Sequence, residues 1–217
     1  MEDLKDKVVL ITGAGPGLGR ALALAFAARG AGVALNDISP LNVDETVEQI
    51  TAAGGRARGY TFDLAKRMPV TALVAQVLED WGRIDFLVNC AAVEPQAAIL
   101  DMDEWDWHRT LDVNLSGAFF TTQQAGRAMR TQGGGVIVNL ACVPDEDRPL
   151  PGRAAYLASQ AGLAGLSRSA AAELAEHGIR VHLVCPQWSL AELAALPDER
   201  AELVWQVLML CSGAGAA

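Results

Sequence analysis

The chain is short of cationic residues and has no paired metal ligands. Its 17 lysines and arginines stand against 26 aspartates and glutamates, which gives a formal net charge of −9. A basic surface for nucleic-acid phosphates is therefore not expected, and anionic membrane surfaces are disfavoured as partners. The four cysteines show no CxxC spacing, which argues against a zinc site. They are Cys90, Cys142, Cys185 and Cys211.

Long uncharged apolar runs are also missing. Residues 1–7 mix acidic and basic side chains, and they show neither the apolar core of a signal peptide nor an Arg-rich transit pattern. No stretch of about 18 residues is free of charges and helix breakers, as a membrane-spanning helix requires. These features predict a cytoplasmic protein with no membrane partner.

The chain is, however, rich in apolar residues. Hydrophobic residues make up 51% of its 217 residues and charged residues 20%, which is typical of a globular domain with one sizeable core. No repeat, low-complexity tract or linker divides the sequence. We expect residues 1–217 to form a single domain that ends in a shortened helical segment at about 188–217.

Apolar runs of strand length alternate with stretches of helical period. The expected strands lie at about 8–11, 33–35, 57–62, 84–90, 136–142 and 179–185. The expected helices lie at about 18–26, 42–53, 69–81, 103–131 and 154–177. Near-continuous apolar strands separated by helices predict a parallel sheet covered on both faces. The predicted fold class is α/β, a single Rossmann-type doubly wound sheet of about six parallel strands.

A glycine-rich loop lies between the first strand and the first helix. In Thr12-Gly13-Ala14-Gly15-Pro16-Gly17-Leu18-Gly19, glycines let backbone amides approach a pyrophosphate, and the helix N-terminus adds partial positive charge. Asp37 ends the second strand, where a carboxylate accepts hydrogen bonds from both adenosine-ribose hydroxyls and repels a 2′-phosphate. The combination predicts a dinucleotide site that takes NAD rather than NADP.

Further short motifs follow the loop in a fixed order. They are Asp63-Leu64 after the third strand, Asn89-Cys90-Ala91-Ala92 after the fourth, Val113-Asn114-Leu115-Ser116-Gly117 in the long helix, and Ala155-Tyr156-Leu157-Ala158-Ser159-Gln160. Over about residues 5–187 the series resembles the TGxxxGxG, NNAG and YxxxK motifs of the short-chain dehydrogenase/reductase family.

The resemblance implies reversible hydride transfer between a nicotinamide and an alcohol or ketone. Tyr156 would be the acid/base, and Asn114 would hold a water in the proton relay. Asp63 would contact adenine, and the Asn89 motif would support the sheet beside the cofactor. Besides the glycine loop and Asp37, the implied cofactor-binding positions are Asp63, Leu64, Asn89, Ala91, Tyr156, Gln160 and Pro186.

The lysine of the family's YxxxK motif is replaced by Gln160. It follows Tyr156 by four residues and shares its helix face, so it can still bond ribose hydroxyls but carries no charge. A cation about 5 Å from a phenol is worth about 3 kcal/mol at an effective dielectric of about 20, or about two pKa units. Without that cation we expect a pKa for Tyr156 near the ordinary value of about 10, which handicaps alcohol oxidation more than ketone reduction.

The family's catalytic serine is also missing. Counting from the fifth strand places Cys142 at its position, and counting thirteen residues back from Tyr156 places Val143 there. Neither has a hydroxyl, and losing one such donor typically costs about 10²–10³ in rate. The family's Pro-Gly is Pro186-Gln187 here. The segment that follows is too short for the usual substrate lid, and the family's final strand is not expected.

These departures leave two hypotheses for function. The first is an NAD(H)-dependent oxidoreductase that weakly reduces a small carbonyl substrate or oxidises an alcohol, with Tyr156, Asn114, Gln160 and Cys142 at the catalytic positions. The second is a catalytically impaired NAD-binding pseudoenzyme that senses cofactor or partners an active relative. The resemblance also implies a homodimer through the helices at about 103–131 and 154–177.

Overall fold

The computed structural model describes residues 4–142, 150–186, 192 and 195–212. One parallel sheet of six strands forms its centre, in the order β3-β2-β1-β4-β5-β6. The strands are β1 (Val8–Thr12), β2 (Gly32–Asp37), β3 (Arg56–Thr61), β4 (Phe86–Asn89), β5 (Gly135–Leu140) and β6 (Ile179–Val184). This architecture confirms the predicted doubly wound α/β fold, and within the described residues the sheet ends at β6.

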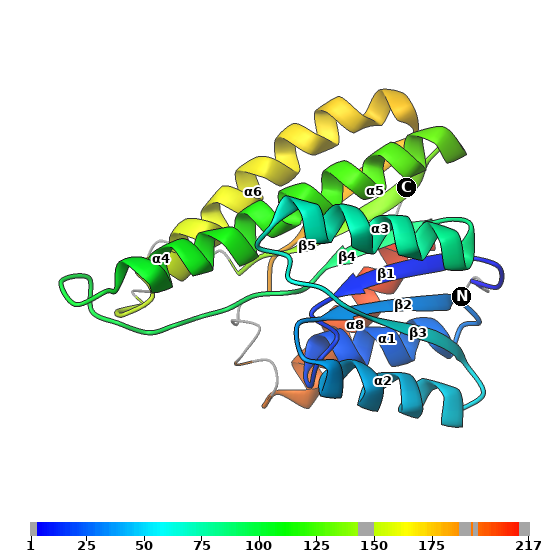
Figure 1. Cartoon of the computed structure of the whole chain (residues 1–217), viewed down its shortest axis with the longest axis horizontal. Helices are drawn as coiled ribbons and strands as arrows, with labels where there is room; N and C mark the ends of the chain where they lie inside the picture. The colour runs from blue at the N-terminus through cyan, green and yellow to red at the C-terminus, as the bar shows by residue number, and fades with distance from the viewer. Residues whose placement is uncertain (1–3, 143–149, 187–191, 193–194, 213–217) are drawn as a thin grey trace.

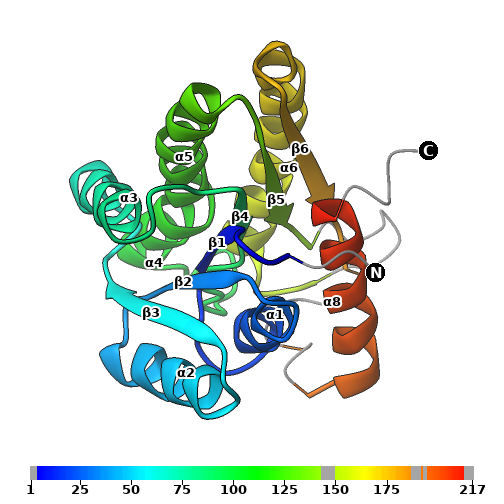
Figure 2. The same cartoon turned by 90° about the vertical axis from the view of Figure 1, so that its right-hand side faces the viewer.

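Helices cover both faces of the sheet (Figures 1 and 2). One face carries α1 (Leu18–Ala27), α2 (Pro40–Ala52) and α8 (Pro197–Cys211), and the other carries α3 (Arg67–Trp81), α5 (Ala118–Gln132) and α6 (Ala154–Leu174). Successive strand residues supply the two cores, because side chains alternate across a sheet. Val9 and Ile11 pack with α1 and α8, whereas Leu10 packs with α3 and α5.

The strand order reverses beside β1, and this reversal positions the site. Thr12, the last residue of β1, lies level with Asn36 of β2 and Asn89 of β4. Its hydroxyl accepts hydrogen bonds from the amides of Cys90, at 3.1 Å, and Ala91, at 3.3 Å. The loops after β1, β2 and β4 therefore meet at one edge, at the kind of crevice where doubly wound folds bind ligands.

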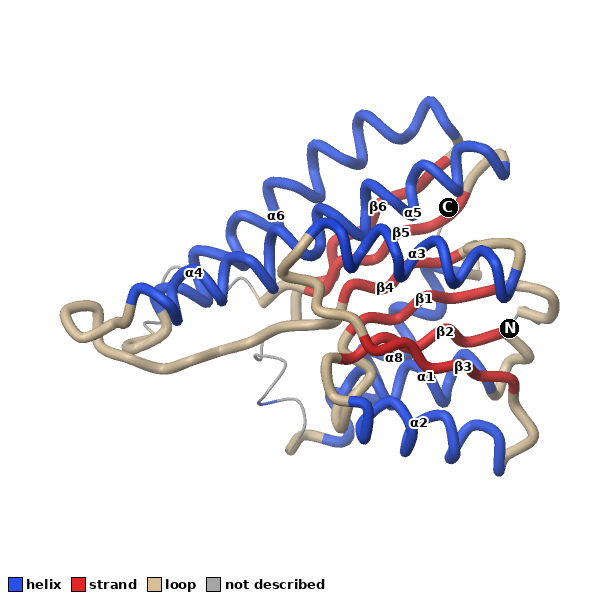
Figure 3. The backbone as a smooth tube through the Cα atoms, viewed as in Figure 1, coloured by secondary structure: helices blue, strands red, loops and turns tan. Residues whose placement is uncertain are grey.

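The helix expected at about 103–131 contains a wider turn that the sequence did not predict. α4 (Glu104–Leu111) passes into a π-helical turn, η1 (Asp112–Gly117), and then into α5, in one continuous rod that Figure 3 shows in blue. A short 3₁₀ turn, η2 (Ala175–His177), extends α6. Within the described residues, no helix combines the length and apolar character needed to span a membrane.

Candidate functional site

The glycine loop is closely packed at two of its glycines. Gly13 has φ +68°, and a Cβ there would lie 2.6 Å from the Cα of Ala91. A Cβ on Gly19 would overlap the carbonyl oxygen of Gly13. Gly17 precedes α1 with φ +111° and makes no side-chain capping bond, so the first turn of α1 has no side chain over its amides.

Asp37 holds the loop as well as facing the cavity beside it. One oxygen, Oδ2, accepts the amide of Gly15 at 3.0 Å, and Oδ1 accepts the amide of Ser39 at 2.9 Å and Nδ2 of Asn42 at 3.3 Å. A carboxylate offers about four acceptor sites, so about one remains on Oδ2. Sequence reasoning missed Asn42, which reaches Asp37 because Ser39 caps α2 and places Asn42 in its first turn.

Asp63 lies where the motif implies, beside a small cavity of about 120 Å³ that Leu64 and Ala91 also line. Both of its carboxylate oxygens contact Nη1 of Arg109, at 3.0 and 3.1 Å, and one also accepts the amide of Ala65. Arg109 is a second residue that the motifs did not single out. Its position in α4, 46 residues away, gave no signal for a pairing that depends on the fold.

Asn89 is buried and bonds to the protein itself. Its Nδ2 donates to Oδ1 of Asn139 at 2.8 Å and to Thr122 at 3.3 Å, while Oδ1 accepts the Thr121 hydroxyl at 2.7 Å. Asn139 continues the chain by donating to Ser167. Asn89 therefore ties β4 to β5 and α5, which is the supporting role that the family resemblance implies.

Asn114 sits in the π-helical turn and joins two segments of the site. Its Oδ1 accepts the amide of Val93 at 2.8 Å, and its Nδ2 donates to the Val93 carbonyl at 2.9 Å and to the Ser159 hydroxyl at 3.0 Å. Ser159 in turn donates to the backbone carbonyl of Tyr156. Asn114 thus fixes the loop after β4 against the helix turn that carries Tyr156. Its implied role of holding a water stays a prediction.

Gln160 bonds to the end of β5 through its side-chain oxygen, and its implied contact with the ribose stays a prediction. The side chain is 1% exposed, and its Oε1 accepts the amide of Cys142 at 2.8 Å. Cys142 lies just beyond the end of β5, and Gln160 provides an acceptor for its amide. Cys142 is itself buried. The alternative serine position, Val143, and the Pro-Gly position, Gln187, lie outside the described residues.

One cavity of about 390 Å³ brings the glycine loop and Tyr156 together. It is lined by Gly13, Gly15, Pro16, Leu18, Gly19, Asp37, Asn42, Cys90, Ala91, Ala92, Glu94 and Tyr156. No lysine or arginine is among these lining residues of the described chain. Cys90 does not supply a thiolate, because burial raises the pKa of its thiol to about 12 and the nearby Asp37 charge adds to the shift.

A sequence model of the short chain dehydrogenases matches residues 7–199. The chain belongs to the short-chain dehydrogenase/reductase family. It is 43% identical over 190 residues to an uncharacterised oxidoreductase of Thermotoga maritima, covering 88% of this chain and 74% of that protein.

Two solved family members are similar in structure as well as in sequence. An NAD⁺-bound xylitol dehydrogenase is 35% identical, with a TM-score of 0.81 over 85% of this chain and 71% of that chain. A metagenomic short-chain oxidoreductase in complex with NADP is 31% identical, with a TM-score of 0.82 over 94% of this chain and 93% of that chain. The chain is therefore a short-chain dehydrogenase/reductase in fold as well as in sequence.

Three positions of the family's catalytic motif lie within the described residues. Tyr156 lines the cavity, and Asn114 lies in the π-helical turn. Gln160, at the position of the family's lysine, directs its side-chain oxygen to the backbone just beyond β5. As a result, the short-chain dehydrogenase/reductase cavity keeps its phenol but has no cation along its described lining.

Proposed function

We propose that this short-chain dehydrogenase/reductase binds NAD(H) between the glycine loop and Tyr156 and reduces a small ketone there. The observation that carries the proposal is the shared cavity of about 390 Å³, whose walls include both the loop glycines and Tyr156. The uncapped N-terminus of α1 fits a pyrophosphate, because its free amides are hydrogen-bond donors at the positive end of a helix.

The residues of this chain hold the substrate's proton donor and position it. When bound, the reduced nicotinamide supplies the hydride. Tyr156, only 1% exposed, holds a proton on its phenol oxygen away from bulk water and donates it to the carbonyl oxygen. Asn114 and Ser159 hold the Tyr156 turn of α6 against the loop after β4. The described lining of the cavity offers no lysine or arginine to favour the phenolate, which suits reduction and disfavours oxidation.

The proposal is tested by NADH calorimetry together with NADH consumption over a panel of ketones. We expect NADH binding and a slow but measurable reduction. The double variant Gln160→Lys with Cys142→Ser restores the cation and a hydroxyl, and we expect it to raise the rate by about 10²-fold or more. It removes the acceptor of the Cys142 amide, so its thermal stability is compared in parallel.

A second function is supported by Gln160, which is buried and uncharged. The described lining of the cavity holds no lysine or arginine that could replace the charge of the family's lysine. In that case the chain is an NAD-binding module without turnover. Binding of NADH with no reduction by either the natural chain or the double variant would favour this alternative over the reductase.

We further propose NAD rather than NADP as the cofactor. Asp37 accepts three hydrogen bonds from the protein and keeps about one acceptor site for a ribose hydroxyl, with Asn42 beside it as a donor. A 2′-phosphate would meet the Asp37 charge, and Arg109, which lines the neighbouring cavity that Asp37 shares, is already paired with Asp63. Since solved relatives carry NAD⁺ in one case and NADP in another, this choice depends on Asp37.

The cofactor choice is checked by thermal shift. We expect NADH to stabilise the protein more than NADPH does, and Asp37→Asn, which removes the charge, to reduce the ratio of the two dissociation constants at least tenfold. Two charges about 5 Å apart interact by about 3 kcal/mol at an effective dielectric of about 20, enough for such a change. Stronger stabilisation by NADPH in the unaltered chain would refute the NAD assignment.

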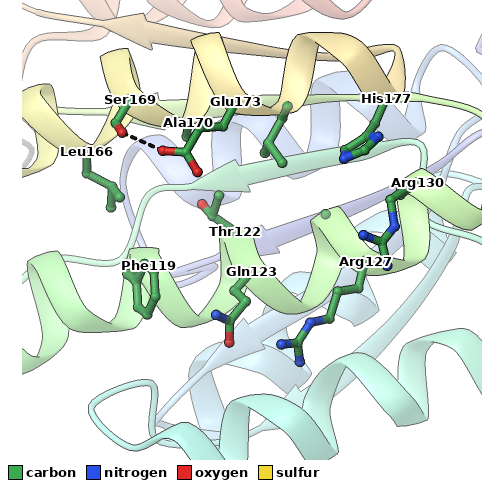
Figure 4. A pocket seen from close by; sticks show the side chains of 12 residues that line it. Phe119, Thr122, Gln123, Arg127, Arg130, Leu166, Ser169, Ala170, Glu173 and His177 are labelled. Atoms are coloured by element: carbon green, nitrogen blue, oxygen red, sulfur yellow. Dashed lines mark hydrogen bonds between the residues drawn. The ribbon is translucent and has the colours of Figure 1, made fainter.

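The partner that we propose is a second copy of the chain, docked on the groove between α5 and α6. The groove has a volume of about 390 Å³, and side chains from both helices face each other across it (Figure 4). Phe119, 41% exposed, and Leu166 give it an apolar part, whereas Arg127 and Arg130 lie on α5 and Glu173 on α6. A two-fold axis would bring these opposite charges together in pairs.

Sedimentation velocity tests this dimer. Phe119→Asp introduces a carboxylate into the apolar part of the groove, and we expect it to shift the chain from dimer to monomer at micromolar concentration. The control is Trp205→Asp, which introduces the same carboxylate at another exposed aromatic residue, on α8 and away from the groove. A natural chain that sediments as a monomer would contradict the proposal.

A further inference from the structure

Three charged side chains join three segments at the carboxyl edge of the sheet. Nη1 of Arg153, the residue before α6, lies 2.9 Å from Oε1 of Glu94 in the loop after β4. Nη2 of Arg153 lies 3.4 Å from Oε1 of Glu192, in the segment between β6 and α8. The Arg153 and Glu94 side chains are only 15% and 10% exposed, so this ion pair is largely removed from solvent.

These three charged side chains, Arg153, Glu94 and Glu192, contribute little to the free energy of folding. A cation at the N-terminus of a helix opposes the helix dipole, and a mostly buried ion pair loses most of its attraction to desolvation. Arg153 precedes Tyr156 by three residues, which places the two on neighbouring positions of one helix end. Arg153 therefore anchors Glu94 beside the helix turn that carries the proposed proton donor.

Glu94 lines the same cavity as Tyr156. Asp37 is the other carboxylate on that lining, and its bonds to Gly15, Ser39 and Asn42 commit it to the glycine loop. As a carboxylate, Glu94 accepts hydrogen bonds and donates none. Arg153 offsets part of the Glu94 charge, but the described lining itself holds two carboxylates and no lysine or arginine, so it favours a neutral hydrogen-bond donor near Tyr156 over an anion.

On the basis of the proposed reductase function, we propose that Glu94 selects the substrate by accepting a hydrogen bond from a hydroxyl group next to the reacting carbonyl. Neutral hydroxyketones, and the polyols that they form on reduction, are the preferred class. The 2-oxo acids are excluded, because their carboxylate occupies the position of that hydroxyl and faces the Glu94 charge.

The test uses three ketones of three carbons each: acetone, hydroxyacetone and pyruvate. Their binding to the NAD⁺-loaded protein is measured by saturation-transfer NMR titration, in which no reaction is needed. We expect hydroxyacetone to bind at least tenfold more tightly than acetone, since a hydrogen bond to a charged group supports a factor of about 10–100. Pyruvate is expected to bind more weakly than acetone.

Two matched variants separate substrate selection from loop structure. Glu94→Gln removes the charge from the cavity, and we expect the hydroxyacetone-to-acetone ratio to fall about tenfold while pyruvate binding increases, a gain that misfolding cannot produce. Glu192→Gln removes a charge from the same Arg153 but not from the cavity lining, and we expect it to leave the three-ketone ranking unchanged.

The outcomes distinguish this inference from the function on which it rests. Equal binding of acetone and hydroxyacetone, or equal effects of Glu94→Gln and Glu192→Gln, would overturn the role of Glu94 while leaving the reductase proposal standing. A calorimetric titration that detects no NAD⁺ binding would overturn the proposed function itself.

Discussion

Replacement of Tyr156 by phenylalanine is expected to lower the rate of ketone reduction at least about 100-fold. Proton transfer by a positioned side chain contributes about 10²–10⁴ in rate, and phenylalanine keeps the ring while removing the only proposed donor. Tyr156 lines the cavity but is not part of the glycine loop, so NADH affinity should change far less than the rate does. Stopped-flow NADH oxidation and calorimetry measure the two effects separately.

The matched control is the chain's other tyrosine. The hydroxyl of Tyr60 donates to Asp80 at 2.7 Å and accepts Nε1 of Trp81 at 3.1 Å, on β3 and α3. Burial, together with the Asp80 bond, raises the pKa of Tyr60, and Tyr60 does not line the cavity of the candidate site. Tyr60→Phe should reduce thermal stability and spare the reduction rate. Equal activity losses in the two variants would refute the assignment of Tyr156.

Replacement of Gly19 by alanine is expected to weaken NADH binding by about 10- to 100-fold. The added Cβ would overlap the backbone oxygen of Gly13, and because that atom belongs to the loop itself, the loop has to move. Forced overpacking typically costs about 1–3 kcal/mol, and each 1.4 kcal/mol is tenfold in affinity. Calorimetric titration with NADH gives the change directly.

Gly165→Ala provides the comparison for this variant. Gly165 lies inside α6, where no atom stands within 4 Å of an added Cβ, and alanine is favoured there by about 0.5–1 kcal/mol. This variant should melt at a higher temperature and bind NADH as the unaltered chain does. If Gly19→Ala bound NADH normally, the loop would not be the pyrophosphate site.

The fold was predictable from the sequence because its signals are local. Buried parallel strands are near-continuous apolar runs, and Val8 to Thr12 is buried at every position. The glycine loop was also predictable, because close backbone packing at Gly13 and Gly19 leaves no room for a side chain and so requires glycine. Element type and order therefore followed from periodicity, with differences of one to a few residues at the ends.

The side-chain partners were not predictable, because they connect residues that are distant in sequence. Arg109 reaches Asp63 across 46 residues, and Asn42 reaches Asp37 only because α2 begins at Pro40. The ribose contact expected of Gln160 stays a prediction, but its side-chain oxygen also accepts the amide of Cys142, which lies 18 residues away in the sequence. A hydrogen bond between a side chain and a backbone amide far away in the sequence leaves no pattern that a single sequence shows.

The π-helical turn at Asp112–Gly117 lets the helices on its two sides each face a different partner. An unbroken α-helix would rotate one of these contacts away from its partner. Before it, α4 directs Arg109 to Asp63; after it, α5 fixes Thr121 and Thr122 against Asn89. An α-helix rotates about 100° per residue, so tightening the turn by one residue would swing one attachment a quarter-turn or more around the rod. The wide turn thus sets the rotation of the Arg109–Asp63 attachment relative to the attachment at Asn89, so the length of this stretch is as constrained as its composition.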